Sequence, residues 1–307
     1  MRVLVVVNTW SGGSDAGLYD FARALGTQGV EVVMRFALPA QRIEELVADA
    51  ASFDRVVAAG GDGTVSAVCY ATRGTGVPVL VYPAGTANLL ALNLGLPLDA
   101  PALARVTLDG APVSFDLGEL RHVDQTGTSR TSGFAVMAGA GYDAAIMETA
   151  APLKATFGAA AYLMAALGNI APTVSEFELV LDGKTVRTDG IAVLLVNFGR
   201  IQFDLAITHG WDPRDGLLDV AIIRAKHPTG LLPAVFAAVF DRMAKFSGRG
   251  SGVVVHRAAQ VEVRAKPALR MQYDGEVLDD LTPFSARSLP RAATLIVPPD
   301  SPFAESA

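Results

Sequence analysis

Short apolar runs alternate with helical patterns over the first third of the chain. Four of these runs are predicted as buried strands, at residues 2–8, 30–36, 55–59 and 77–82. The spacing of apolar positions between them predicts helices over residues 15–26, 40–51 and 64–72. This order is typical of a parallel sheet with helices on both faces. The pattern therefore predicts a doubly wound parallel α/β domain at the N-terminus.

Beyond Leu117 the alternation gives way to β-rich segments. Strands are predicted over residues 111–121, 131–139, 174–182, 190–197, 216–224, 253–265, 269–273 and 293–297, with apolar helical stretches at roughly 144–168 and 229–246. Turn signals such as Asp182-Gly183 flank these strands and indicate an antiparallel sheet. We therefore expect two domains, residues 1–118 and 119–307. A cleft between two domains is a natural place for a site.

Size and composition support this division and exclude some partners. A chain of 307 residues exceeds the length at which single cores stop growing, about 250–300 residues. Its formal charge of -6 argues against a nucleic-acid partner. Attraction to anionic lipid headgroups would have to come from a local patch, because the overall charge has the wrong sign. Cys69 is the single cysteine and the four histidines show no ligand spacing, so we predict neither a disulfide nor a zinc site.

Two stretches bear on membranes and targeting. Residues 1–8 are read as a buried strand of a cytosolic protein, because the apolar run is too short for a signal peptide. Residues 155–175 carry no charge and are long enough to span a bilayer. Glycines, Asn169, Pro172 and many alanines dilute their hydrophobicity, so a buried or interfacial helix is favoured over a transmembrane segment.

The loop Gly60-Gly61-Asp62-Gly63-Thr64 leaves a predicted strand and opens a helix. Glycines let the backbone approach a phosphate chain, and a helix start adds free N–H groups and a positive dipole end. Asp62 would then lie beside phosphates, where it could bind a metal, accept a proton or orient the loop. The alternative is a tight turn in which Asp62 caps the helix.

Two further segments carry candidate polar groups. The loop Pro83–Asn88 also follows a strand and opens a helix, so Thr86 and Asn88 could donate to phosphate or ribose oxygens, or simply cap that helix. Tyr273-Asp274-Gly275-Glu276 places two carboxylates at a strand end, where one could take a proton or both could serve Mg2+. Isolated carboxylates of this kind also occur in solvated turns.

Taken together, these segments resemble a known family, the bacterial diacylglycerol kinase-like lipid kinases. That family includes the eukaryotic diacylglycerol and sphingosine kinase catalytic domains and is more distantly similar to NAD kinases. The matching segments occur in the family's order and span most of the chain: Asn8 with Ser11-Gly12-Gly13, Gly60–Thr64, Pro83–Asn88, Asn93–Pro97, Gly139–Ala144, Asp215–Val220 and Asp274–Glu276.

The resemblance implies a two-domain kinase with ATP in the interdomain cleft. It implies nucleotide contacts from Asn8, Ser11, Gly12, Gly60, Gly61, Gly63, Thr64 and Thr86, which Asn88 joins by its position in the second loop. It also implies that Asp62, Asp274 and Glu276 are catalytic, with Glu276 or Asp62 as proton acceptor. A structural Mg2+ site would map onto Asp212, Asp215 and the Leu217 carbonyl, whereas the sequence alone favours a turn at Asp215-Gly216.

Two departures from the family pattern concern specificity. Many members have an acid where this chain has Leu89, which leaves the lipid open. Many have a threonine where this chain has Ala37, which weakens an expected nucleotide contact without threatening the fold.

The predicted function is ATP-dependent phosphorylation of a lipid hydroxyl at a membrane surface, most simply that of diacylglycerol. The resemblance implies a cytoplasmic protein with peripheral contact at the inner face of the membrane, and it leaves a homodimer open. A sphingoid-base or other lipid kinase, a kinase of a soluble substrate in the manner of NAD kinase, and a silent nucleotide- or lipid-binding protein are the alternatives. Retention of Asp62, Asp274 and Glu276 argues against a silent protein.

Overall fold

The computed structural model describes residues 1–9, 15–38, 41–141, 173–201, 205–206, 211–224 and 253–304. Ser11, Gly12 and the two helices predicted over 144–168 and 229–246 lie outside these residues. Within the described ranges, no helix is long and apolar enough to cross a membrane.

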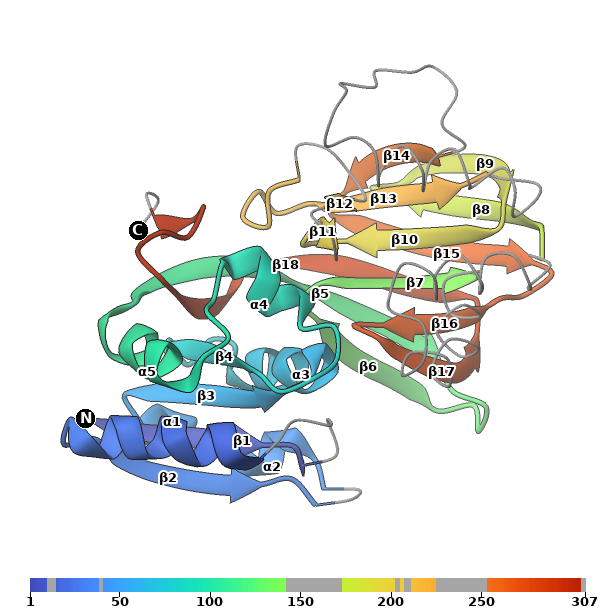
Figure 1. The fold of residues 1–307 in the computed structure, drawn as a ribbon. Helices are drawn as coiled ribbons and strands as arrows, with labels where there is room; N and C mark the ends of the chain where they lie inside the picture. Colours follow the sequence, from blue (N-terminus) through green and yellow to red (C-terminus); the bar gives the residue numbers. More distant parts are fainter. Residues whose placement is uncertain are drawn as a thin grey trace, which may run out of the picture.

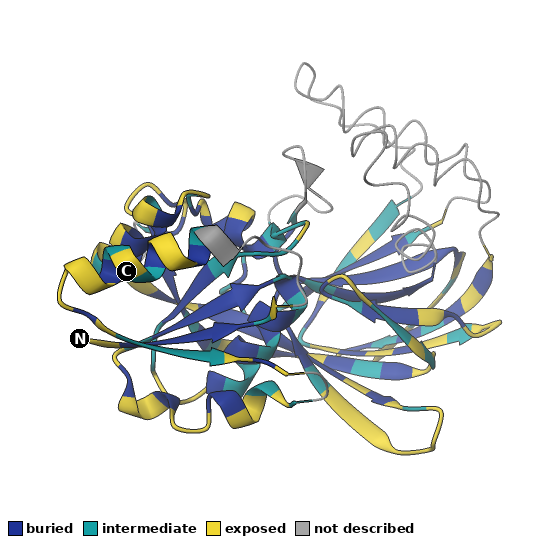
Figure 2. Cartoon of the chain, turned by 60° about the horizontal axis from the view of Figure 1, so that its bottom comes forward, coloured by how far each residue is buried: buried dark blue, intermediate teal, exposed yellow. Residues whose placement is uncertain are grey.

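The N-terminal region is a parallel sheet with helices on both faces (Figures 1 and 2). Its strands run in the order β2-β1-β3-β4 and cover Arg2–Val7 (β1), Glu31–Phe36 (β2), Arg55–Gly60 (β3) and Val79–Pro83 (β4). Its helices are Asp15–Thr27 (α1), Ile43–Leu46 (α2), Asp62–Thr72 (α3), Leu89–Leu94 (α4) and Ala100–Asp109 (α5). Helix α1 packs against α5, and α2 packs against α3. The predicted doubly wound arrangement is confirmed.

The rest of the described chain is built almost entirely from antiparallel strands. They are Ala111–Val123 (β5), Ser129–Phe134 (β6), Met137–Gly141 (β7), Ser175–Leu181 (β8), Lys184–Gly190 (β9), Ala192–Val196 (β10), Arg200–Ile201 (β11), Leu205–Ala206 (β12), Leu218–Ile223 (β13), Val253–Ala258 (β14), Gln260–Lys266 (β15), Arg270–Tyr273 (β16), Glu276–Leu281 (β17) and Phe284–Val297 (β18). A six-stranded sheet has the order β14-β13-β10-β7-β16-β17. It faces the strands β5, β8, β15 and β18, and apolar side chains from both sheets fill the space between them. The predicted antiparallel β-rich region is thus a sandwich.

Strand β18 joins the two regions. Its first half pairs with β15, and near its end Leu295 pairs in parallel with Val79 of β4. The continuous ten-stranded sheet therefore runs from β2 to β9 through β18. Farther on, Phe303 packs against Phe115 and Phe198, which belong to the N-terminal core cluster. The C-terminal end of the chain is thus part of the N-terminal core.

Three sequence predictions differ in detail from the structure. The helix predicted over 40–51 is only α2 followed by a short 3-10 turn at Ala50–Ser52. The strand predicted over 131–139 is two strands, because the chain bends at residues 135–136 and directs their backbone N–H groups into the Asp274 carboxylate. The strand predicted over 253–265 is likewise β14 and β15, and β9 and β17 were not predicted.

Candidate active site

A pocket of about 320 Å³ lies where the carboxyl ends of β1 and β2, the start of α3 and the β16–β17 turn come together. Its lining residues are Asn8, Ala37, Leu38, Gln41, Ile43, Gly63, Thr64, Ala67, Tyr273 and Glu276. One part of the lining is polar and glycine-rich and the other is apolar. A larger, open groove of about 580 Å³ lies among β8, β9 and β15, and no predicted site residue lines it. Because ligands of parallel sheets bind at the carboxyl ends of the strands, the smaller pocket is the candidate site.

The start of α3 supplies the polar side of this pocket. Gly61 precedes the helix in an extended conformation, and no side chain caps the helix. The first intrahelical bond runs from the Val65 N–H to the Gly61 carbonyl, so the N–H groups before it precede the helical ladder. Asn8, at the end of β1, donates from Nδ2 to Thr64 Oγ1 at 2.8 Å. This arrangement of free N–H groups and neutral donors suits a phosphate group.

The second predicted loop lies directly beside the first. Gly85 is so close to the Gly61 backbone that a Cβ at Gly85 would clash with it. Asn88 adopts a left-handed conformation with φ 48° and closes the turn, accepting from Gly85 N at 2.8 Å and donating to Gly85 O at 2.9 Å. Thr86 is exposed and does not line the pocket. The structure thus gives Asn88 a turn-forming contact and leaves the ligand role of both residues a prediction.

Asp62 connects the two loops. Its Oδ2 accepts from Leu89 N at 3.0 Å and its Oδ1 from Leu90 N at 2.9 Å, so it caps the first turn of α4 across the chain. The residue is buried, and burial raises the pKa of its carboxyl although the two N–H groups lower it. Of the three roles left open by the sequence, this geometry is that of a loop organiser. Its predicted catalytic role stays a prediction.

The Asp274 carboxylate accepts more hydrogen bonds than the Asp62 carboxylate. Both oxygens accept backbone N–H groups, from Ala135 at 2.7 Å, Val136 at 2.9 Å and Met137 at 2.8 Å, and Oδ2 also contacts Ser66 Oγ on α3. Burial nevertheless raises the pKa of Asp274 to about 7. The carboxylate therefore ties the β6–β7 bend and α3 to the turn that precedes β17.

Glu276 is the acidic residue that faces the pocket. Asp274 and Gly275 have φ of 42° and 89° and form a two-residue turn, which places Glu276 at the start of β17. Its carboxyl lies against Gly63, where an added Cβ would come within 2.5 Å of Oε1. Among the described residues its carboxylate has no hydrogen bond or ion pair, and partial burial raises its pKa. An unpaired carboxylate with a raised pKa beside a phosphate-type loop can accept a proton.

The predicted Mg2+ site has different surroundings. Asp212 accepts from Arg214 Nε at 3.0 Å, and Asp215 is ion-paired with Arg257 while its Oδ1 accepts from Leu217 N at 2.9 Å. No group of three metal-binding side chains occurs in the described part of the chain. Asp212 and Asp215 are thus ion-paired in a turn, and Arg257 also contacts Asp219, so the role of Asp212, Asp215 and Leu217 as Mg2+ ligands stays a prediction.

The structure thus brings together Asn8, Gly60, Gly61, Gly63, Thr64 and Glu276, and it places Asp62 and Asp274 behind them. Sequence reasoning did not single out Gln41, Ile43, Ala67 or Tyr273, which line the same pocket. Ala67 lies three residues after Thr64 on α3, so helical spacing from the glycine loop could have indicated it. No local signal marked Gln41 or Ile43, because one lies in the short connection after β2 and the other begins the short helix α2.

Comparison with known protein families assigns both parts of the chain. Residues 2–120 match the diacylglycerol kinase catalytic domain, and residues 136–297 match the YegS C-terminal NAD kinase beta sandwich-like domain. A probable lipid kinase YegS-like protein of Pseudomonas putida is 32% identical over 95% of each chain. A diacylglycerol kinase of Mycobacterium tuberculosis is 29% identical over 97% of this chain and 95% of its own length. An uncharacterised Synechocystis protein is 26% identical, and the match spans only 60% of its length.

Solved structures share the fold. A crystal structure of a putative diacylglycerol kinase from Bacillus anthracis superposes with a TM-score of 0.76 over 98% of each chain, at 18% identity. Yeast NADH kinase superposes with a TM-score of 0.56 over 97% of this chain and 84% of its own, at 13% identity. The two family matches and the relatives covering nearly the whole chain agree. The chain belongs to the diacylglycerol kinase and YegS-like family of lipid kinases, which are phosphotransferases.

Proposed function

We propose that this protein transfers the γ-phosphoryl group of ATP to a primary hydroxyl of a lipid, with diacylglycerol as the first candidate acceptor and phosphatidic acid as product. The observation that carries this proposal is the meeting of Glu276 with Gly63 at the start of α3. A proton acceptor and a phosphate-type loop lie in one pocket. The name of the Mycobacterium tuberculosis relative, diacylglycerol kinase, favours this acceptor.

In this proposal the N–H groups at the start of α3, together with Asn8 and Thr64, bind the phosphate chain. Glu276 accepts the proton of the lipid hydroxyl as its oxygen forms a bond to the γ-phosphorus. The bond from that phosphorus to the β–γ bridging oxygen breaks, and ADP leaves. Positioning and electrostatics supply most of the rate in such transfers. When bound to the nucleotide, Mg2+ would neutralise phosphate oxygens, and we assign it no residues here.

The same proposal assigns the two substrates to different domains. Residues 1–118 would hold the nucleotide and residues 119–307 the acceptor, with β17 returning Glu276 to the nucleotide side. The acceptor is a lipid, so turnover would occur at a membrane surface. The first turn of α4 begins with Leu89 and has no carboxylate of its own.

The proposal is tested with the purified chain, labelled ATP, Mg2+ and a panel of acceptors: diacylglycerol, a sphingoid base, ceramide, a polyprenol and NAD. Label in phosphatidic acid is the expected result. Label in another lipid would support the proposal of a lipid kinase and would replace diacylglycerol as its acceptor. Label only in NADP would overturn the lipid acceptor, and no transfer to any acceptor would favour a silent binding protein.

A further inference from the structure

Two arginines bind one buried carboxylate on a face of the ten-stranded sheet, and a third arginine contacts the tyrosine that also binds it. Glu119 on β5 has a side chain only 5% exposed, whereas Arg121 on β5 and Arg287 on β18 are 53% and 48% exposed. Both guanidinium groups bind the same oxygen, Oε1, at 2.7 Å and 2.8 Å. The third arginine, Arg73, follows the last turn of α3. None of these residues lines the pocket that holds Glu276.

Tyr70 connects Arg73 to this cluster. Its hydroxyl donates to Glu119 Oε2 at 2.7 Å, and the Arg73 guanidinium lies 3.7 Å from the centre of its ring. The ring lies against Gly133 of β6, where a Cβ would leave no room for it. The cluster is therefore built on α3, β5, β6 and β18 and does not depend on a single loop.

The charges in this cluster do not balance. Two guanidinium groups bind Glu119 and a third lies over the Tyr70 ring, so these four charged groups carry two excess positive charges in a protein of formal charge -6. The next acid on the neighbouring strand, Glu262, already pairs with Arg264 at 3.8 Å. Each guanidinium has five N–H donors, and the contacts of Arg121 and Arg287 with Glu119 use only some of them. All three arginines are exposed, so their remaining donors can reach a ligand.

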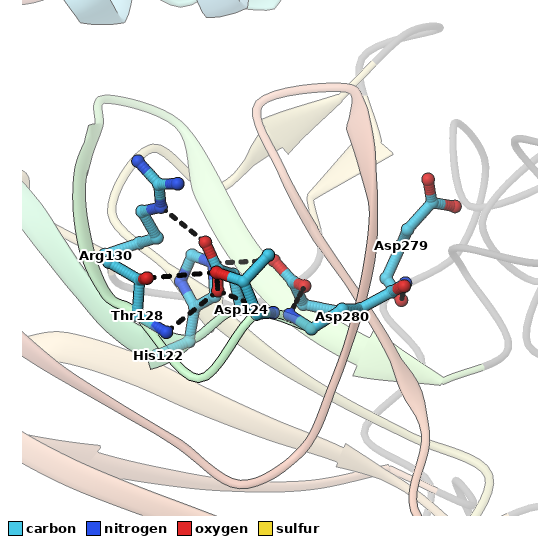
Figure 3. A network of polar contacts seen from close by, with 8 residues as sticks. His122, Asp124, Thr128, Arg130, Asp279 and Asp280 are labelled. Carbon is cyan, nitrogen blue, oxygen red and sulfur yellow. Dashed lines mark hydrogen bonds and ion pairs between the residues drawn. The ribbon is translucent and has the colours of Figure 1, made fainter.

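The acidic residues near the adjoining β5–β6 hairpin already have polar partners. Asp124 accepts from Thr128 N at 2.9 Å and from Arg130 Nε at 2.7 Å (Figure 3). Asp280 of β17 contacts His122 Nε2 at 2.9 Å and accepts from Gln125 N. Val123, two positions beyond Arg121 and so on the same face of β5, is 58% exposed. An exposed apolar residue thus stands beside the positive cluster.

We propose that Arg73, Arg121 and Arg287 form a binding site for the phosphate group of an anionic phospholipid in a bilayer. The planar fork of arginine matches phosphate oxygens, and a pre-positioned fork loses less freedom on binding. A dianionic phosphate would balance the two excess charges. This site lies apart from the pocket and is independent of the identity of the acceptor lipid.

The test measures partition of the full-length chain, without ATP, onto vesicles of phosphatidylcholine alone and of phosphatidylcholine with phosphatidic acid. Arg73→Gln and Arg121→Gln should each weaken binding to the anionic vesicles roughly fivefold, with little change on neutral ones. Added salt should reduce the difference. Arg105→Gln removes an equal charge from the exposed face of α5 and serves as the matched control.

Several outcomes decide the matter. Unchanged binding in both variants, or an equal loss in Arg105→Gln, would overturn the site. Displacement of the protein from vesicles by glycerol phosphate at the same phosphate concentration would assign the arginines to a free phosphate ester instead. Within the described ranges the polar and ring contacts of Arg73 are with Tyr70 alone, so Arg73→Gln should keep the thermal midpoint and the activity on a dispersed short-chain substrate. Because binding is measured without turnover, the result does not depend on the proposed kinase reaction.

Discussion

The β16–β17 turn and the segment Asp212–Leu217 both present two acidic residues close together in sequence, and their surroundings differ. In the first, Asp274 is occupied by backbone N–H groups while Glu276 faces the pocket without a partner among the described residues. In the second, Asp215 is ion-paired with Arg257, which also contacts Asp219. We therefore expect a pair of acids to be more reactive where no cation from a neighbouring strand contacts it. The predictions below test this difference.

The largest effect is expected at Glu276. Glu276→Gln keeps the shape of the side chain and removes the proton acceptor, so kcat should fall by about 10²–10⁴. The KM for ATP should change little, because no donor to the phosphate chain is lost. Steady-state kinetics on the acceptor identified in the panel measure both constants.

The pH dependence of kcat provides a second test of Glu276 as the proton acceptor. Burial raises the pKa of Glu276, and a base must be ionised to act. In the wild type, log kcat should therefore rise with pH through that raised pKa and then level off. Glu276→Gln should lose this dependence; a variant that keeps it would move the proton acceptor to another group.

The next largest effect is expected at Asp274, on stability. Asp274→Asn sets an amide N–H group against the N–H groups of residues 135–137, which leaves buried donors unsatisfied. The free energy of unfolding should fall by about 1–3 kcal/mol, measured by urea denaturation. Ser66→Ala removes only one donor and should cost less. An Asn variant as stable as the wild type would mean that these contacts contribute nothing.

The raised pKa of Asp274 also predicts that the free energy of unfolding depends on pH. The pKa of Asp274 is raised to about 7 in the folded protein, above its ordinary value of 3.8. Between these two values the folded state holds a proton that the unfolded state releases, so the free energy of unfolding falls as pH rises across that window. It should level off above the folded value. Asp274→Asn should lack this decrease.

The sequence showed more of the fold than of the site. Its apolar runs located the strands of the parallel sheet, and Asp274-Gly275 indicated the turn. The contact between Ser66 and Asp274 joins positions 208 residues apart, and no local pattern encodes such a pair. The contact between Glu276 and Gly63 likewise joins distant positions that no local pattern pairs. Sequence patterns report which face of an element is buried, whereas the pairing of distant turns depends on how both sheets pack.

A smaller effect is expected at Asp62. Asp62→Asn keeps one acceptor and loses the second, so one of the Leu89 and Leu90 N–H groups loses its partner. The free energy of unfolding should fall by about 0.5–2 kcal/mol, as for a lost helix cap. The KM for ATP should rise more than kcat falls, because the glycine loop shifts. A loss of kcat as large as that of Glu276→Gln would instead make Asp62 a catalytic residue.

The smallest effect is expected at Asp215, and it completes the comparison. Its partner Arg257 is 43% exposed, and exposed ion pairs contribute about 0–1 kcal/mol, so Asp215→Asn should change stability by no more than this. The dependence of activity on magnesium concentration should match that of the wild type, since the carboxylate is ion-paired with an arginine. A shifted magnesium dependence would show that a metal ion can displace Arg257 from Asp215. It would then support the metal site that the family resemblance implied. Unchanged dependence would leave magnesium to the nucleotide pocket, which Glu276 lines.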